Sequence, residues 1–322
     1  MKRFLIYTLA AVMLLAALAG CSAGADADRT AGQNEGKLSV VTTIFPPYDF
    51  ARAVSGGLAD VTMLIDPGAE VHSFDPTTQD IIKIQNCDVF IYIGGENDAW
   101  VDTVLGSMDT SDKTIIKLMD AVTPVEEETV EGMQAEEKSE TSGEEGPEFD
   151  EHIWTSPKNA MLMVDAIADA MAKADSANAD AYKKNAADYN AQIKAVDERI
   201  QGIVDKAPQK LIVVADRFPF RYFVDEFGLN YVAAFSGCSA ESDVSAGTLA
   251  YIIDKVKENN IKYIYYIELS NKQVAEAVSE QTGAQTLLLH SCHNVTKADF
   301  DAGVTYVKLW QKNADNLEKG LD

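Results

Sequence analysis

The chain is predicted to adopt an α/β fold of two β/α lobes with parallel sheets, joined by one long connecting helix. Three observations support this prediction. Short apolar strand patterns alternate with helical patterns in both halves of the chain, which is typical of parallel strands buried under helices. Between the halves, an apolar stripe with helical spacing continues for roughly 27 residues. About 285 residues follow an N-terminal leader and tether, enough for two lobes.

The N-terminus predicts an exported protein. Residues 1–20 are interpreted as a signal peptide, because a basic start precedes an apolar run at Phe4–Leu18 that is too short for a settled transmembrane helix. Leu18-Ala19-Gly20-Cys21 resembles the lipobox of bacterial lipoproteins, in which the cysteine is lipidated; the alternative is an ordinary signal peptide with a chance cysteine. Residues 21–37 lack apolar periodicity and are expected to form a flexible tether. We therefore expect an extracytoplasmic protein, held at the cell membrane by a lipid on Cys21.

Residues 38–175 are predicted to form the N-terminal lobe. Strand patterns and helical patterns alternate there in the order Leu38–Ile44, Tyr48–Ser55, Val61–Ile65, Pro76–Asn86 and Val89–Ile93, and a further helix is expected at Ala160–Ala174. Ser156-Pro157 supplies a cap and a first-turn proline for that last helix.

An acidic insertion interrupts this lobe at residues 124–151. From Glu126 to Glu151, twelve acidic residues stand against the single lysine Lys138. Such a segment buries too little apolar surface to offset its ordering entropy, so we expect a mobile loop. It is either a solvated linker or a weak, exchangeable store of cations.

The connecting helix is expected at residues 176–207, and the C-terminal lobe at residues 208–322. The same alternation of strands and helices returns there, in the order Leu211–Ala215, Tyr222–Phe227, Tyr231–Phe235, Thr248–Asn259, Ile261–Ile267, Lys272–Thr282, Gln285–Leu289 and Thr305–Leu317. Glycines at 228 and 283 end two of these helices.

Charge and cysteine content narrow the possible partners. A formal net charge of −24 argues against nucleic acid and favours cations. Cys87 lies at the entrance to an apolar strand and is expected to pack as a small hydrophobic residue. Cys238 and Cys292 fall in loops of an exported chain, so they form either a disulfide or two free thiols.

The four histidines indicate a metal site. His72, His152, His290 and His293 are far apart in sequence, each in or near a loop that leaves a strand. Imidazole is a common ligand of transition metals, and distant loops meet only where a fold brings strand ends together. The pattern predicts one site between the lobes, with no catalytic residue.

Two segments resemble motifs of a known family. Pro67–Thr77, with His72-Ser73-Phe74-Asp75-Pro76, and Asp150–Pro157, with His152-Ile153-Trp154, resemble motifs of the metal-specific solute-binding proteins of ABC importers, the zinc and manganese cluster. The resemblance covers residues 38–320. It implies two β/α lobes bridged by a long helix, a metal in the cleft, and His72 and His152 as ligands from the N-terminal lobe.

The C-terminal lobe departs from the family pattern. The family's third ligand corresponds to Arg217, which stays protonated and cannot ligate; the adjacent Asp216 is a weaker substitute. The last ligand position corresponds to His290, with His293 three residues on. We expect His290 to ligate and His293 to fill the vacancy at Arg217, whereas the sequence leaves open whether both do. Glu268 either orients a ligating imidazole or makes a hinge or cap contact.

An imidazole-rich set favours Zn²⁺ over Mn²⁺, and copper or nickel remain possible by intrinsic affinity. The resemblance implies a monomeric receptor that delivers the ion to an ABC permease. Two other classes stay open. A surface adhesin is one; the other is a zinc metallohydrolase, for which the chain lacks His-Glu-x-x-His or paired carboxylates and which four closed protein ligands would exclude. We therefore expect a protein that is not an enzyme.

Overall fold

The computed structural model describes residues 36–134, 149–239 and 243–322. The predicted signal peptide, the lipidation site Cys21 and all but the last two residues of the tether lie outside this range. So do residues 135–148 of the acidic insertion. Leu38–Asp322 forms one compact unit. Within the described residues, no helix combines the length and apolar character needed to cross a membrane.

The N-terminal lobe is a four-stranded parallel sheet with the order β2-β1-β3-β4. Its elements are β1 (Leu38–Thr42), α2 (Phe45–Ser55), β2 (Ala59–Met63), α3 (Thr78–Asn86), β3 (Val89–Tyr92), α4 (Ala99–Gly106) and β4 (Thr114–Lys117). The prolines at 46 and 47 occupy the first turn of α2, so that helix begins three residues before the predicted start. β4 was not predicted from the sequence; its side chains are half-buried or exposed, and among the described strands it pairs with β3 alone.

The C-terminal lobe repeats this plan, with the parallel order β6-β5-β7-β8. Its elements are β5 (Leu211–Phe218), α7 (Arg221–Phe227), β6 (Asn230–Ser236), α8 (Ala246–Glu258), β7 (Tyr263–Tyr266), α9 (Gln273–Thr282), β8 (Gln285–Leu288), α10 (Lys297–Asp301) and α11 (Tyr306–Gly320). The two parallel sheets confirm the predicted fold class.

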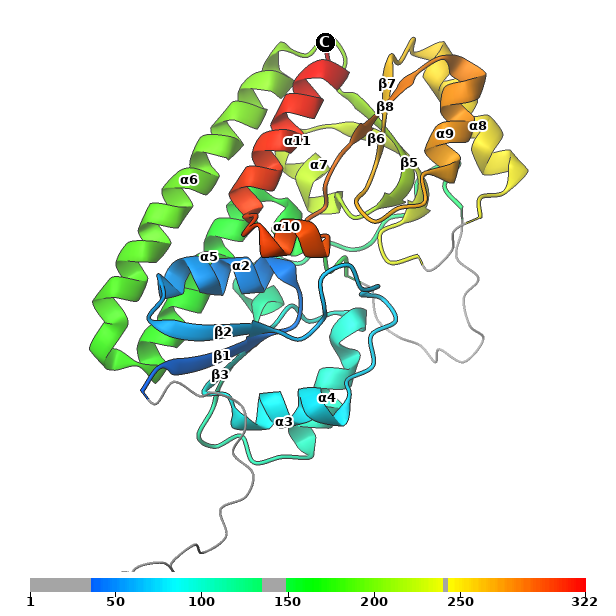
Figure 1. Ribbon diagram of the computed structural model, residues 1–322. Coiled ribbons are helices and arrows are strands. Elements are labelled where there is room, and N and C mark those ends of the chain that lie inside the picture. The colour runs from blue at the N-terminus through cyan, green and yellow to red at the C-terminus, as the bar shows by residue number, and fades with distance from the viewer. Residues whose placement is uncertain (1–35, 135–148, 240–242) are drawn as a thin grey trace, which may run out of the picture. The chain divides into compact units, whose positions relative to one another are not determined.

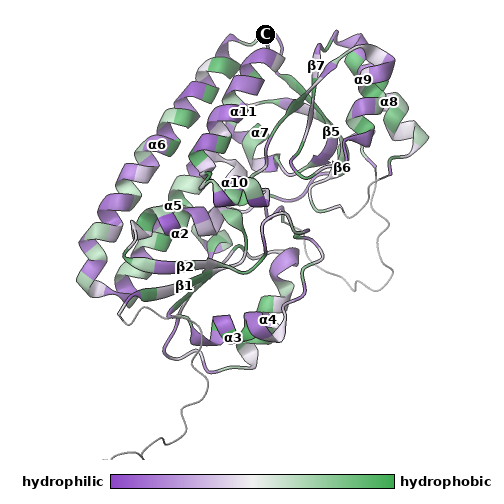
Figure 2. Cartoon of the chain, viewed as in Figure 1, coloured by the Kyte–Doolittle hydropathy of each residue, from purple (hydrophilic) through white to green (hydrophobic). Residues whose placement is uncertain are grey.

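Two helices lie between the sheets in the chain, α5 (Pro157–Ala174) and the 28-residue α6 (Ala179–Lys206). α6 is the predicted long connecting helix, and it packs against α2 of one lobe and α11 of the other (Figure 1). Polar and apolar bands alternate along it (Figure 2), and its buried residues, among them Tyr189, Ile193, Val196 and Ile200, recur every three or four positions.

One large hydrophobic core is shared by the two lobes, and each lobe has a smaller buried cluster of its own. A continuous cluster of buried residues runs from Val40 in β1 through Trp154 and Ile193 to Trp310 in α11. A buried carboxylate also links three helices, because Asp49 of α2 accepts hydrogen bonds from the Tyr189 hydroxyl in α6 and from the backbone N–H of Tyr306 in α11. The lobes are therefore held together by packing as well as by the chain.

The described ends of the acidic insertion are attached to the C-terminal lobe. Val125 N–H donates to the Tyr222 hydroxyl at 3.1 Å, and Gln134 N–H donates to the carbonyl of Ala234 at 2.9 Å. Met133 between them is buried. Backbone hydrogen bonds and one apolar side chain therefore anchor these ends, while the rest of the predicted mobile loop, residues 135–148, lies outside the described residues.

Candidate metal centre

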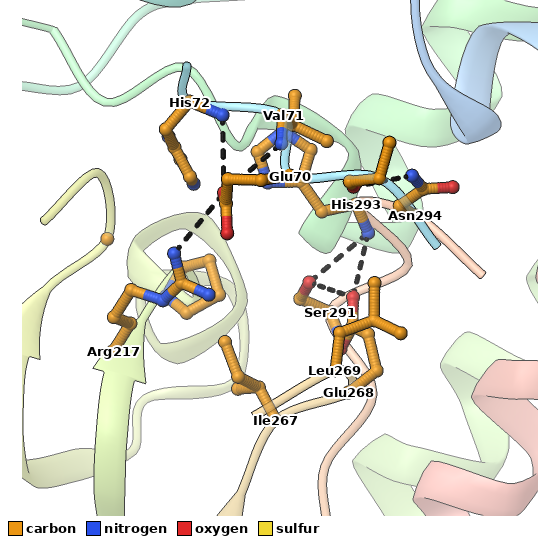
Figure 3. Close-up of a pocket in the computed structure, with 13 residues that line it drawn as sticks. Glu70, Val71, His72, Arg217, Ile267, Glu268, Leu269, Ser291, His293 and Asn294 are labelled. Carbon is orange, nitrogen blue, oxygen red and sulfur yellow. Dashed lines mark hydrogen bonds and ion pairs between the residues drawn. The ribbon is translucent and has the colours of Figure 1, made fainter. Parts of the chain in front are cut away.

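The predicted site residues lie where parallel strands end, at the carboxyl edges of the two sheets. His72 is in the loop after β2, and His152 follows the acidic insertion directly. His293 lies in the loop after β8. In open α/β folds, ligands bind in the crevice outside these strand ends. A small cavity of about 40 Å³ lies there, and it is lined by residues of both lobes, including His72, Arg217, Glu268 and His293 (Figure 3).

Three imidazoles converge at this edge. Potential ligand atoms of His72, His152 and His293 all lie within 4.8 Å of one another. The ring centroid of His293 is 4.9 Å from that of His72 and 5.0 Å from that of His152. His72 and His152 belong to the N-terminal half of the chain and His293 to the C-terminal half, so the group draws on both.

His152 is held in an orientation suited to metal binding. Its Nδ1 lies 3.0 Å from Oδ1 of Asp150, which also accepts from the backbone N–H of His152 at 2.8 Å. Because a carboxylate only accepts, Nδ1 carries the hydrogen, and Nε2 of the neutral ring has a free lone pair. That Nε2 is buried and has no hydrogen-bond partner among the described residues. A buried nitrogen of this kind is costly unless a ligand completes it.

His72 is oriented by Asn97, whose Nδ2 lies 2.8 Å from Nδ1 of His72. Asn97 stands in the short helix Glu96–Asp98, which follows β3. Rotating its amide by half a turn would present Oδ1 instead, the partner that an imidazole ligating through Nε2 requires. The backbone N–H of Asn97 also donates to Oε2 of Glu151 at 3.1 Å.

Glu268 fixes the loop that carries His293. Its carboxylate accepts from the backbone N–H of Ser291 at 2.7 Å and from that of His293 at 3.1 Å, and also from the Ser291 hydroxyl (Figure 3). These bonds to the loop are made with backbone N–H groups and a hydroxyl, which agrees with the alternative of a cap contact for Glu268.

His290 lies outside the group of three. Its Nδ1 accepts from the backbone N–H of Cys292 at 3.0 Å and is 3.4 Å from the Glu268 carboxylate. Its own backbone N–H donates to Asn313 in α11. Cys292 has a left-handed backbone, with φ 65°, and this turn carries His293 toward the cavity. The structure therefore brings three of the four predicted histidines together.

Of the two alternatives for Cys238 and Cys292, the structure has two free thiols and not the disulfide. Cys292 is fully buried beside His290. Cys238 instead approaches the N-terminal half, with Sγ 3.6 Å from Oε1 of Glu151. Cys87 is also free and buried, as predicted.

Arg217 forms an ion pair at the cavity, whereas Asp216 bonds to the backbone. One guanidinium nitrogen of Arg217 lies 3.5 Å from Oε1 of Glu70, across the mouth of the cavity from His72 (Figure 3). Each oxygen of the Asp216 carboxylate accepts from one backbone N–H, that of Arg217 or that of Ile267. Among the described residues, Asp216 neither lines this cavity nor belongs to a group of potential metal ligands, so it does not replace the missing third ligand.

The electrostatics keep two of the three imidazoles neutral. Burial, with the neighbouring His152 and Arg217, lowers the pKa of His72 to about 4. Burial and the other two histidines lower the pKa of His293 well below its usual value. Burial also opposes charge on His152, but Asp150 and Glu151 outweigh it and raise the pKa of that ring. A neutral imidazole is the form that binds a metal.

Four residues that contact the site were not predicted from the sequence, namely Asp150, Glu151, Asn97 and Glu70. Asp150 and Glu151 were counted as part of the acidic insertion, although both are buried. Their position directly before His152 was the available signal, since carboxylates beside ligating histidines are common partners of the second ring nitrogen. No sequence signal identified Asn97, which reaches His72 only through the fold.

Comparison with known proteins gives a family match over residues 40–320, to the model described as zinc-uptake complex component A, periplasmic (ZnuA). The zinc-binding lipoprotein AdcA of Streptococcus pneumoniae (strain TIGR4) is 34% identical over 292 residues, which cover 90% of this chain and 57% of AdcA. The chain thus spans little more than half the length of that relative. The high-affinity zinc uptake system protein ZnuA of Bacillus subtilis (strain 168) is 30% identical over 318 residues, covering 98% and 97% of the two chains.

Solved structures with the same fold include the Zn(II)-bound ZnuA-like domain of S. pneumoniae AdcA, with a TM-score of 0.73 at 30% identity, covering 89% of this chain and 100% of that one. The metal-dependent lipoprotein YcdH of B. subtilis gives a TM-score of 0.75 at 29% identity, covering 88% and 99%. The laminin-binding protein Lmb of Streptococcus agalactiae gives 0.74 at 27% identity, covering 88% and 100%. The match over nearly all of the described chain, together with these relatives, establishes that the protein belongs to the ZnuA family of zinc-uptake components.

Proposed function

We propose that this protein is an extracytoplasmic receptor that captures a zinc ion with His72, His152 and His293 and delivers it to an ABC permease. The observation that carries the proposal is the buried Nε2 of His152, which lacks a partner among the described residues and lies beside two other imidazoles. A divalent metal ion would complete all three rings.

The donor set supports zinc over manganese. Three neutral nitrogen ligands suit zinc, whereas manganese prefers more oxygen ligands. Two relatives in the family are named for zinc binding or zinc uptake, and one related domain is solved with Zn(II) bound. Zinc here is the cargo of the protein, so no resident cofactor is part of the proposal.

The family consists of transport components, and we therefore propose no enzymatic role. Four protein ligands would exclude a hydrolase on geometry alone, but the described residues offer a group of three imidazoles. The proposal that the protein is not an enzyme therefore depends on its family membership. Adhesion is named for the laminin-binding relative Lmb. We propose anchoring through lipidated Cys21, a monomeric state and a membrane permease as the receptor's partner, on the sequence arguments given above.

Metal analysis and zinc titration of the purified protein test the proposal. His72→Ala, His152→Ala and His293→Ala should each weaken zinc binding by more than the roughly 10–100-fold typical of a group that only orients a ligand. His290→Asn is the matched control, because the Asn amide oxygen can still accept from the backbone N–H of Cys292. Equal losses in the His290 and His293 variants, or a preference for manganese in the wild type, would overturn the assignment.

A further inference from the structure

Beside the three imidazoles, a second group of potential ligands shares one residue with the first. Ligand atoms of His72, Glu151 and Cys238 also lie within 4.8 Å of one another. Imidazole, carboxylate and thiolate are the three ligand types that zinc accepts most readily. The family resemblance assigned no metal role to Glu151 or Cys238.

The Glu151 carboxylate is held at this place from two sides. The backbone N–H of Asn97 donates to Oε2 at 3.1 Å, while Oε1 faces the Cys238 thiol at 3.6 Å. Gly95 makes room for it, since a Cβ there would lie 2.6 Å from Oε2, and the φ of 86° at Gly95 favours glycine in any case. The side chain of Glu151 is thus buried next to the histidines rather than extended into solvent with the rest of the acidic insertion.

The loop after β6 brings the thiol to the site. Gly237, the residue before Cys238, lies directly against the ring of His152, because a Cβ at 237 would be 3.0 Å from Cε1 and 3.1 Å from Nδ1 of that ring. Cys238 itself is half-buried, whereas Cys87 and Cys292 are buried. Of these three thiols, it is the one within reach of an ion in the cavity region.

We propose that His72, Glu151 and Cys238 form a second position for a thiophilic divalent ion of the zinc group, adjacent to the three-imidazole position. This inference rests on the proposed function, because His72 is a ligand at both positions. One nitrogen of the His72 ring faces Asn97, so the ring offers one nitrogen to a metal and the two positions are occupied in turn. The ion therefore passes between a Cys/Glu/His set and a three-His set, and one ion is bound per protein.

Cadmium supplies a direct readout of the thiolate. Adding up to one equivalent of Cd²⁺ to the wild-type protein should produce the ultraviolet thiolate-to-metal charge-transfer band. Cys238→Ser should lose this band, while Cys87→Ser, which removes a buried free thiol of the N-terminal lobe, should keep it. Absence of the band in the wild type, or its persistence in Cys238→Ser, would overturn the proposal.

Two further measurements separate this proposal from the proposed function. His293→Ala should lose tight zinc binding but keep the cadmium band, because the second position does not include His293. If His293→Ala keeps tight zinc binding, the result contradicts the three-imidazole site but not the second position. In the His293→Ala variant, one equivalent of Cd²⁺ should also slow alkylation of Cys238, located by peptide mass. An unchanged alkylation rate in that variant would overturn the second position.

Discussion

Removing the Asp150 carboxylate should weaken zinc binding without removing a ligand. Asp150 is buried, and its Oδ1 accepts both from Nδ1 of His152 at 3.0 Å and from the backbone N–H of His152 at 2.8 Å. These two bonds fix the ring and place the hydrogen on Nδ1, so that the lone pair of Nε2 is free for the ion. Without them the ring can rotate or change tautomer, and metal binding must then restore the order.

The expected loss follows from the role of a group that orients a ligand. Such groups typically contribute about 10–100-fold in metal affinity, or about 1.4–2.7 kcal/mol. Asp150→Ala removes both bonds and should fall toward the upper end of this range. Asp150→Asn keeps one acceptor oxygen but loses the charge, so its affinity should lie between that of the alanine variant and that of the wild type.

Competition with a chromogenic zinc chelator measures these affinities. Asp175→Asn is a suitable control, because that carboxylate accepts from Asn178 and Tyr182 near the start of α6 and does not line the cavity. Thermal unfolding of the metal-free variants checks that the fold is retained. If Asp150→Ala binds zinc as tightly as the wild type, then the hydrogen bond does not prepare His152 for the ion and the geometric argument for the site is wrong.

Three further predictions concern protons, charge and packing. Zinc competes with the proton on His152, whose pKa is raised above its usual 6.5, so the zinc affinity should fall about tenfold per pH unit as the pH drops below that pKa. The fall should become steeper only near pH 4, where the pKa of His72 lies. A fall steeper than about tenfold per pH unit that begins near neutral pH would contradict the neutral state of His72. Arg217→His should tighten zinc binding by adding a fourth imidazole at the cavity wall, whereas Arg217→Gln should leave the zinc affinity equal or slightly higher. The same chelator competition measures both affinities. Weaker zinc binding in both variants would show that the arginine supports the site. Asp49→Ala should lower the free energy of unfolding by about 2–5 kcal/mol in urea titrations, because a buried tyrosine hydroxyl and a backbone N–H lose their acceptor. Asp188→Ala, at an exposed position, should have little effect. Similar urea midpoints for the two variants would show that the hydrogen bonds of Asp49 do not help to hold the lobes together.

Much of the fold could be predicted because its signals are local. The apolar residues of α6 recur with the same helical spacing along all 28 residues, so the sequence alone indicates this helix. β4 carries no such signal, since its four residues are half-buried or exposed and the strand exists because β3 offers it an edge. The shared core was also not predictable, since periodicity shows which face of a helix is apolar and not which lobe it meets.

The site was predictable only as far as motifs reach. His72 and His152 stand in segments with family patterns, and the structure brings them together with His293. The choice between His290 and His293 depends on the left-handed turn at Cys292, a residue type that gives no sign of a positive φ. The sequence could not decide between a disulfide and free thiols for a related reason, because two loops of one lobe need not face each other and Cys238 faces the other half of the chain.

The shared core explains how a site built from distant segments can be formed before the metal arrives. His72 and His152 come from one half of the chain and His293 from the other, so any free rotation of the lobes would separate them. The buried cluster that runs from β1 to α11 opposes such rotation, because opening it would expose apolar surface to water. Asp49 adds a cost, since its buried partners would lose their acceptor. The entropy cost of bringing the imidazoles together therefore arises on folding and not on metal binding. The free energy of the nitrogen–metal contacts then contributes directly to the affinity for the ion and to its selection.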